Sequence, residues 1–328
     1  MSHGPRVVFG HRADSSAEHY VSAMSNAVAT KPKWDGVARV AATYVIGCGL
    51  GLVWLVAGPD TSHLWLDGLI ADLIATVVVF VASRLHHNSS FYDAYWSVLP
   101  PLLALYWWVG ADAGVSDARW WLMLGVMVVW AVRLTWNWVY GFPGLHHEDW
   151  RYEKLRASAG KAEFVADLFG IHVIPTLQVF MGMLGAYVVA TRAGEAFGLL
   201  DVIAFVVGAG AVTIETVADV QMHRFVAAKK AGGAVGAVMD RGLWSWSRHP
   251  NYFGEWGFWL SVALFGLAAD HGAWWVLLGP VAMLAMFYGA SIPMMEERSI
   301  ERRPEYADVV GRISKFVPLP PRRTKAAA

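Results

Sequence analysis

The chain has 328 residues, of which 56% are hydrophobic and only 16% are charged, and it contains 18 tryptophans. Soluble domains carry about 25% charged residues, so this composition predicts an integral membrane protein. The formal net charge is zero, which speaks against a nucleic-acid partner, and the single cysteine, Cys48, can form no disulfide within the chain.

Eight apolar segments follow one another along the chain, each near the ~20 residues that cross a bilayer. The first and the third are short, and the third contains the pair Pro100 and Pro101. We therefore predict an all-α, polytopic membrane bundle of about seven or eight transmembrane helices; in the seven-helix alternative one weak segment is re-entrant, and the third segment suits that role best. The segments are residues 40–56, 64–83, 95–110, 120–140, 164–190, 197–222, 252–269 and 273–293.

The distribution of basic residues predicts the orientation of the bundle. Arg119 and Arg192 lie in segments on one side, Arg133 lies inside a span, and all other lysines and arginines lie on the opposite side. Basic residues favour the cytoplasm, so both termini are predicted to be cytoplasmic. We expect a cytoplasmic arm over residues 1–38, one membrane-embedded domain over residues 39–320 and a tail over residues 321–328.

Residues 241–255 place a cationic run directly before an apolar span. Pro250 suits the first turn of a helix, because it lacks an N–H group and its φ angle is fixed. Arg248 and His249 therefore precede a helix N-terminus, whose free N–H groups and dipole favour an anion. The alternative interpretation is a cationic turn at the membrane edge.

Ionisable residues inside apolar spans are costly and usually functional. Arg133 in the fourth segment and Glu215 and Asp219 in the sixth are the clear cases, and the last two share one helix face because they are four residues apart. They indicate either a wet cavity for a polar ligand or an internal network that pairs helices. Asp67 and Asp72, in the second segment, are better explained as satisfied interior carboxylates or by a shifted span boundary.

Two connecting stretches carry further candidate residues. Before the third span, Tyr92, Asp93 or Tyr95 is a candidate proton donor near a bound lipid, although a helix cap and an interfacial aromatic belt explain them equally well. In residues 146–152 the adjacent histidines lack the spacing of a helix-borne zinc site, so we predict no metal. Arg151 between two aromatic residues suits phosphate and ring binding better.

Taken together, these stretches resemble a bacterial family of membrane proteins of unknown function that belongs with the steroid 5α-reductases. The signature runs from Gly242, Leu243 and Trp244 into residues 247–255, and residues 88–96, 133–138, 148–152 and 215–224 support it. No GxGxxG or GxxxxGK[ST] motif is present, so any nucleotide must bind within the helical bundle. The resemblance implies a multi-pass protein of the bacterial inner membrane, with a cytoplasm-facing NADPH pocket and a lipid-like enone as substrate.

The resemblance also implies roles for residues. Asn251 and Glu255 look like the contacts of the nicotinamide, and Arg151 and Arg248 are the candidates for the phosphates. The Glu–Tyr pair that holds the steroid ketone has no secure counterpart, and Trp130 stands where a tyrosine is expected. The predicted catalytic residues are Tyr92, Asp93, Tyr95 and Glu255. The predicted cofactor contacts are Arg133, Asn137, Asp149, Arg151, Tyr152, Asp219, Gln221, Arg224, Arg248, His249, Asn251, Tyr252 and Glu255.

The function predicted from these observations is an NADPH-dependent reductase of a conjugated double bond in a steroid or isoprenoid lipid. One alternative is an S-adenosylmethionine-dependent methyltransferase of the isoprenylcysteine type, which shares Arg248, His249 and Pro250 and the Glu296–Glu297 ending. Another is a membrane protein that binds lipid without catalysis.

Overall fold

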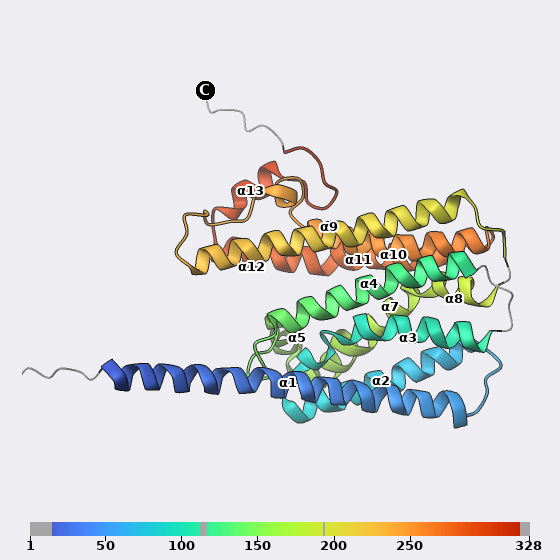
Figure 1. Cartoon of the computed structure of the whole chain (residues 1–328), viewed down its shortest axis with the longest axis horizontal. Coiled ribbons are helices and arrows are strands. Elements are labelled where there is room, and N and C mark those ends of the chain that lie inside the picture. Colours follow the sequence, from blue (N-terminus) through green and yellow to red (C-terminus); the bar gives the residue numbers. More distant parts are fainter. Residues whose placement is uncertain (1–14, 112–116, 193, 322–328) are drawn as a thin grey trace, which may run out of the picture.

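The computed structural model describes residues 15–111, 117–192 and 194–321, with the backbone alone for residues 15–32 and 117. Within these ranges every regular element is helical, which confirms the predicted all-α bundle. The axes of the long helices are roughly aligned with one another (Figure 1). The elements are α1 (Ser15–Ala57), α2 (Leu64–His86), η1 (Ser89–Tyr92), α3 (Tyr95–Gly110), α4 (Asp117–Gly141), α5 (Trp150–Ala159), η2 (Gly160–Ala162), α6 (Glu163–Val165), η3 (Ala166–Val173), α7 (Ile174–Gly182), α8 (Leu184–Thr191), α9 (Leu199–Lys230), η4 (Gly242–Ser245), α10 (Pro250–Ala269), η5 (Trp274–Leu277), α11 (Leu278–Met286), η6 (Phe287–Ser291), α12 (Ile292–Arg302) and α13 (Tyr306–Arg312).

Six helical stretches of the described residues are long and apolar enough to cross a membrane: Lys33–Ala57, Leu64–His86, Ala118–Gly141, Trp150–Gly182, Leu199–Lys230 and Trp274–Arg302. The other two predicted spans correspond to α3, which has only 16 residues, and to α10, which has 20. Large apolar side chains cover much of the outside of the bundle, among them Val45, Val56 and Leu199, which are 72%, 79% and 76% exposed. Such a surface suits contact with lipid.

Helix α10 occupies the middle of the C-terminal half of the bundle. It packs against α4, α7, α8, α9 and α11, and its buried residues include Phe258, Trp259 and Phe265. The main hydrophobic core therefore lies around the helix that follows the cationic run of the sequence. Any side chain on the first turns of α10 is placed where several helices meet.

Helix α1 runs without a break from Ser15 to Ala57, across the predicted limit of the arm at residue 38, and the division into arm and membrane domain stays a prediction (Figure 1). One predicted span differs from the structure. The predicted fifth span, residues 164–190, is not one regular helix. It contains the π-helical turn η3, then α7, and it is interrupted at Met183 before α8.

The interruption at Met183 accompanies an unusually close approach of α8 to α10. A Cβ atom added to Gly185 would lie 2.2 Å from the carbonyl oxygen of Val262, a distance that no real side chain tolerates. Glycine at this position therefore lets the two helix backbones touch, as small residues do at helix contacts in membranes.

Replacing Gly185 by valine is expected to lower the free energy of unfolding by about 3 kcal/mol, the upper end of the range for overpacking. Thermal unfolding in detergent measures this loss. The matched control is Gly210→Ala in α9, where an added Cβ meets no atom within 4 Å; it should leave the unfolding temperature unchanged or slightly raised. Equal unfolding temperatures for Gly185→Val and the unmodified protein would contradict the close helix contact.

Candidate functional site

A partly buried cluster of charges lies where α4, α9 and α10 meet. The Arg133 guanidinium donates to the carboxylate of Glu215 and, at 2.8 Å, to Oδ2 of Asp219. The side-chain amide of Asn137, one turn further along α4, donates to the same Oδ2 atom at 3.2 Å. The structure thus brings together residues from α4 and α9 that are more than 80 positions apart in the chain.

Glu255 from α10 lies beside this charge cluster. Its side chain accepts hydrogen bonds from the indole N–H groups of Trp130, at 3.0 Å, and Trp259, at 2.8 Å, and the residue is only 6% exposed. Trp130 therefore has a definite place in the cluster: its ring stacks on Phe258 at a centroid distance of 4.1 Å and its N–H holds the carboxylate.

Gly254 explains how α10 brings Glu255 so close to α9. A Cβ atom at this position would lie 2.5 Å from Cγ of Glu215 and 2.8 Å from the carbonyl oxygen of Ala211. Only a residue without a side chain permits this approach. The consequence is that Glu255, held by its two tryptophans, lies beside the pairs that Arg133 makes with Glu215 and Asp219.

The cluster has unfilled hydrogen-bonding capacity. Among the residues that the structure describes, Nε of Arg133 and Oε1 of Glu215 are buried without a hydrogen-bond partner. A buried polar atom left unpaired is costly, so each such atom calls for an explanation. A cavity of about 240 Å³ lies alongside and is lined by Arg133, Trp136, Asn137, Tyr140, Thr216, Asp219, Val220 and His223.

The Arg248–His249 pair of the signature lies against the C-terminal part of the chain. Arg248 donates to Glu296 at 2.6 Å and to the carbonyl oxygens of Val310 and Ile313, at 2.9 and 2.6 Å, and its side chain is 5% exposed. His249 contacts the same Glu296 oxygen at 3.2 Å. The phosphate contact of Arg248 stays a prediction, and it would require these bonds to rearrange.

Other predicted cofactor contacts hold the signature in place. Gln221 on α9 accepts a hydrogen bond from the backbone N–H of Leu243 at 2.9 Å, and so it fixes the turn that precedes Arg248. The ring of Tyr252 stacks between His249 and Phe287, at 5.5 and 4.7 Å. Asn251 is partly buried and Arg224 is exposed.

A further group of predicted residues joins the start of α5 to the segment before α3. Asp149 caps α5 by accepting from the backbone N–H of Arg151, and it pairs with the Arg151 guanidinium at 2.7 Å. The Tyr152 hydroxyl donates to Asp93 at 2.7 Å. Burial raises the pKa of Asp93 to about 6, against the lowering effect of this hydrogen bond. Asp93 is therefore a carboxyl group that changes charge near neutral pH.

Tyr92 and Tyr95 belong to the N-terminal half of the bundle, and the structure adds a residue that the sequence prediction did not select. The Tyr95 hydroxyl donates to Oδ1 of Asp72 on α2 at 2.8 Å. This is a buried carboxylate–tyrosine pair of the kind for which the sequence offered no secure counterpart. The sequence indicated Asp72 because an acidic residue is unusual in an apolar span. Its pairing with Tyr95 is found only in the structure.

The residue after Tyr95 contacts the surroundings of Glu255. Trp96, which follows Tyr95, lies with its ring centroid 6.0 Å from that of Trp130, whose N–H holds Glu255. Many of the predicted site residues thus lie in four separate contacts: the Arg133 cluster, the Asp72–Tyr95 pair, the Asp93–Tyr152 contact and the Arg248–Glu296 contact. In the described part of the chain, no three histidine, cysteine or acidic residues are arranged to hold a metal ion.

Fold and site together define a multi-pass integral membrane protein with a buried polar cluster between its helices. The chain belongs to the family described as "Protein of unknown function (DUF1295)", whose model matches residues 79–312. It is similar to an uncharacterized protein of Schizosaccharomyces pombe, with 27% identity over 272 residues, covering 76% of this chain and 78% of the relative. No solved structure matches the chain at a significant level.

Proposed function

We propose that this protein is a membrane-bound, NADPH-dependent reductase that saturates a conjugated C=C bond in a steroid-like or isoprenoid lipid. The observation that carries the proposal is the cluster of Arg133, Glu215, Asp219 and Glu255, in which Glu215 and Glu255 are buried between helices and Arg133 and Asp219 line a cavity of about 240 Å³. Ionisable side chains within membrane-spanning helices cost free energy, so we expect these residues to have a role in binding or catalysis.

The residues of the cluster fit the nicotinamide and ribose end of the cofactor. Two carboxylates pair with the Arg133 guanidinium and a third, Glu255, lies beside them, and this excess of carboxylates favours a ligand group that carries or develops positive charge. Asp219 can accept hydrogen bonds from ribose hydroxyls and Asn137 can donate to them. The Nε–H group of Arg133 is a further donor without a partner. The cavity is smaller than the ~300–1,000 Å³ of typical ligand sites, so it suits one end of a dinucleotide rather than the whole.

When bound, the nicotinamide would supply a hydride to the β carbon of an enone. The protein's own part is to bind the carbonyl oxygen and to supply a proton as negative charge develops there. Tyr95, held by Asp72, is the group we assign to this task, because its hydroxyl is buried and bonded to a carboxylate, and because the next residue, Trp96, contacts the tryptophan that holds Glu255. Residues 39–320 would work as one domain at the inner bacterial membrane.

A methyltransferase that uses S-adenosylmethionine is the second candidate function. The observation that favours it is the bond between Arg248 and Glu296, because these two residues carry the resemblance to the isoprenylcysteine methyltransferases. A sulfonium cation would also suit the excess of carboxylates around Arg133. NADPH carries phosphate groups and S-adenosylmethionine carries none, so measuring which of the two cofactors the protein binds distinguishes the two functions. Binding of a lipid with neither cofactor would leave the third candidate, a lipid-binding protein without catalysis.

The proposal predicts that the purified protein binds NADPH and that Asp219→Asn weakens this binding by at least about 10-fold, which corresponds to 1.4 kcal/mol. Titration in detergent with the fluorescence of the reduced nicotinamide measures the affinity. The matched control is Asp67→Asn, which changes a buried carboxylate of α2 outside the cluster and should leave the affinity unchanged. Equal affinities of Asp219→Asn and the unmodified protein would remove Asp219 from the site.

A further inference from the structure

A continuous row of polar side chains runs between α2, α3 and α7. From Asp72 it passes to the Tyr95 hydroxyl at 2.8 Å, to Thr76 at 3.4 Å, to Thr176 at 2.9 Å and to the Tyr92 hydroxyl at 2.9 Å. All five residues are buried, at 5% exposure or less. Burial also raises the pKa of the Tyr92 hydroxyl, so this group stays a neutral donor and acceptor.

The row continues beyond Tyr92 to a buried histidine. The ring of Tyr92 packs edge-on against that of His172 at a centroid distance of 5.2 Å. One nitrogen of His172 contacts the Ser83 hydroxyl at 3.1 Å and the other contacts the carbonyl oxygen of Asp167 at 2.9 Å. His172 lies in the π-helical turn η3, a distortion that is frequent at functional sites.

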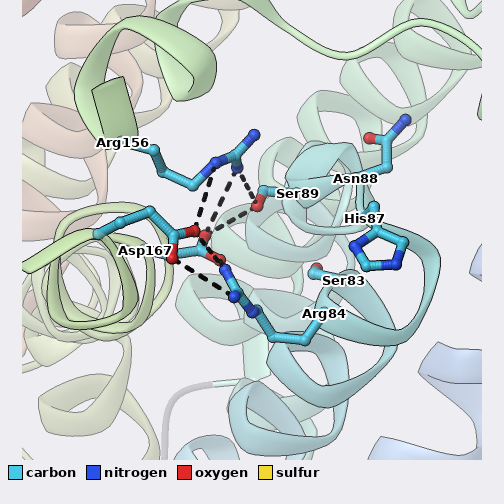
Figure 2. Close-up of a pocket in the computed structure, with 8 residues that line it drawn as sticks. Ser83, Arg84, His87, Asn88, Ser89, Arg156 and Asp167 are labelled. Carbon is cyan, nitrogen blue, oxygen red and sulfur yellow. Dashed lines mark hydrogen bonds and ion pairs between the residues drawn. The ribbon is translucent and has the colours of Figure 1, made fainter. Parts of the chain in front are cut away.

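Ser83 and Asp167 line a cavity of about 160 Å³ at the far end of the row (Figure 2). Arg84 pairs with Asp167 at 2.9 Å and with Glu163, and Arg156 donates to Ser89, which in turn bonds to Asp167. The side chains of Arg84 and Glu163 are 38% and 35% exposed, so the cavity reaches the surface. The polar row therefore reaches the surface at this cavity.

We propose that this row is a proton path from the Asp167 cavity, through His172 and Thr176, to Tyr95. Asp72 and Ser83 are 11 positions apart on α2, so the path extends about 16 Å along the helix. Each hydroxyl accepts a proton on one side and releases one on the other, which leaves no net change in the row. The step between His172 and Tyr92 is a ring contact, so the path requires the histidine ring to turn away from Ser83 or Asp167 and reach the Tyr92 hydroxyl.

The purpose of the path rests on the proposed function. Reduction of an enone adds a hydride to carbon and takes one proton from the protein, so a Tyr95 hydroxyl that gives up its proton must regain one from water in each turnover. A site closed to water by lipid and by aromatic rings needs such a route. The existence of the path, in contrast, is a property of the protein without cofactor or substrate and is testable there.

The test measures hydrogen–deuterium exchange of the tyrosine hydroxyls. Protein labelled with ¹³C at the ζ carbon of tyrosine is transferred to D₂O, and the isotope shift of that carbon reports the exchange of each hydroxyl by NMR; Tyr92→Phe and Tyr95→Phe assign the two signals. Thr176→Val keeps the side-chain shape and breaks the row, and His172→Phe removes the entry. We expect both variants to slow the exchange of Tyr95 at least 10-fold.

Thr191→Val is the matched control, because Thr191 bonds only to the backbone of its own helix, at Tyr187, outside the row. It should leave the exchange of Tyr95 unchanged. Unaltered exchange of Tyr95 in both Thr176→Val and His172→Phe would overturn the path. A protein that binds no NADPH but shows the expected slowing would instead reject the proposed function and leave the path standing.

Discussion

Replacing Arg133 by leucine is expected to lower the free energy of unfolding by about 3–5 kcal/mol and to abolish NADPH binding. Arg133 contacts both Glu215 and Asp219, and removal of one partner from a buried ion pair leaves charge uncompensated. Here the change would leave carboxylates and no cation at the meeting point of α4, α9 and α10. Thermal unfolding and NADPH titration in detergent measure the two effects separately.

A second buried ion pair provides the matched control. Arg119 on α4 bonds to both carboxylate oxygens of Asp201, at 2.6 and 3.0 Å, and to the carbonyl oxygens of Glu195 and Ala196, and both charged side chains are 1% exposed. Arg119→Leu should cost a similar free energy of unfolding but leave NADPH affinity unchanged, because the pair has no contact with the Arg133 cluster.

Arg133→Lys tests the role of Arg133 in NADPH binding if the leucine variant does not fold. Lysine retains the charge but lacks the planar fork that reaches two carboxylates at once. The lysine variant should therefore fold and bind NADPH at least about 10-fold more weakly. Full NADPH affinity in Arg133→Lys, or a loss of binding in Arg119→Leu equal to that of Arg133→Leu, would show that this cluster acts only through stability.

The second large effect is expected at Glu255. Glu255→Gln should reduce cofactor-dependent turnover by at least about 100-fold, comparable to the removal of one group that stabilises a transition state. The reason is the loss of a carboxylate from the cluster that favours positive charge on the ligand. Glu255→Ala should abolish turnover and also cost about 1–3 kcal/mol for each of the two indole N–H groups, of Trp130 and Trp259, left without an acceptor.

Trp130→Phe separates the two roles of Glu255. It removes one hydrogen bond to Glu255 but keeps an aromatic ring near Phe258 and leaves the carboxylate in place. This variant should lose stability as Glu255→Ala does, yet retain most of its turnover. Turnover in Glu255→Gln within a factor of two or so of the unmodified protein would remove Glu255 from the chemistry, because fold-changes of that size correspond to well under 1 kcal/mol.

The sequence predicted the fold well because apolar runs of membrane length have one stable solution, a helix. It located every apolar segment, but it did not foresee the breaks in residues 164–190. Those breaks arise from packing: Gly185 touches the backbone of α10, and no local pattern encodes the identity of that neighbour. The π-helical turn that carries His172 was not foreseen either.

The candidate site could be predicted in part. The cost of charge inside a span pointed to Arg133, Glu215 and Asp219, and the structure places them in contact. Which residue pairs with which was beyond the sequence, since it depends on how each helix is rotated. The sequence showed Asp72 as an acidic residue within a span but did not indicate its hydrogen bond to Tyr95. It also did not indicate that the Arg248 guanidinium bonds to Glu296 and to the C-terminal segment.

The most direct test of the account is to identify the small molecule that copurifies with the protein from mild detergent, by absorbance in the reduced-nicotinamide band and by mass spectrometry. We expect NADPH or NADP⁺ to copurify with the unmodified protein and with Asp67→Asn, and to be absent from Asp219→Asn. Recovery of S-adenosylmethionine or S-adenosylhomocysteine in its place would contradict the reductase and assign the carboxylates around Arg133 to a sulfonium cation.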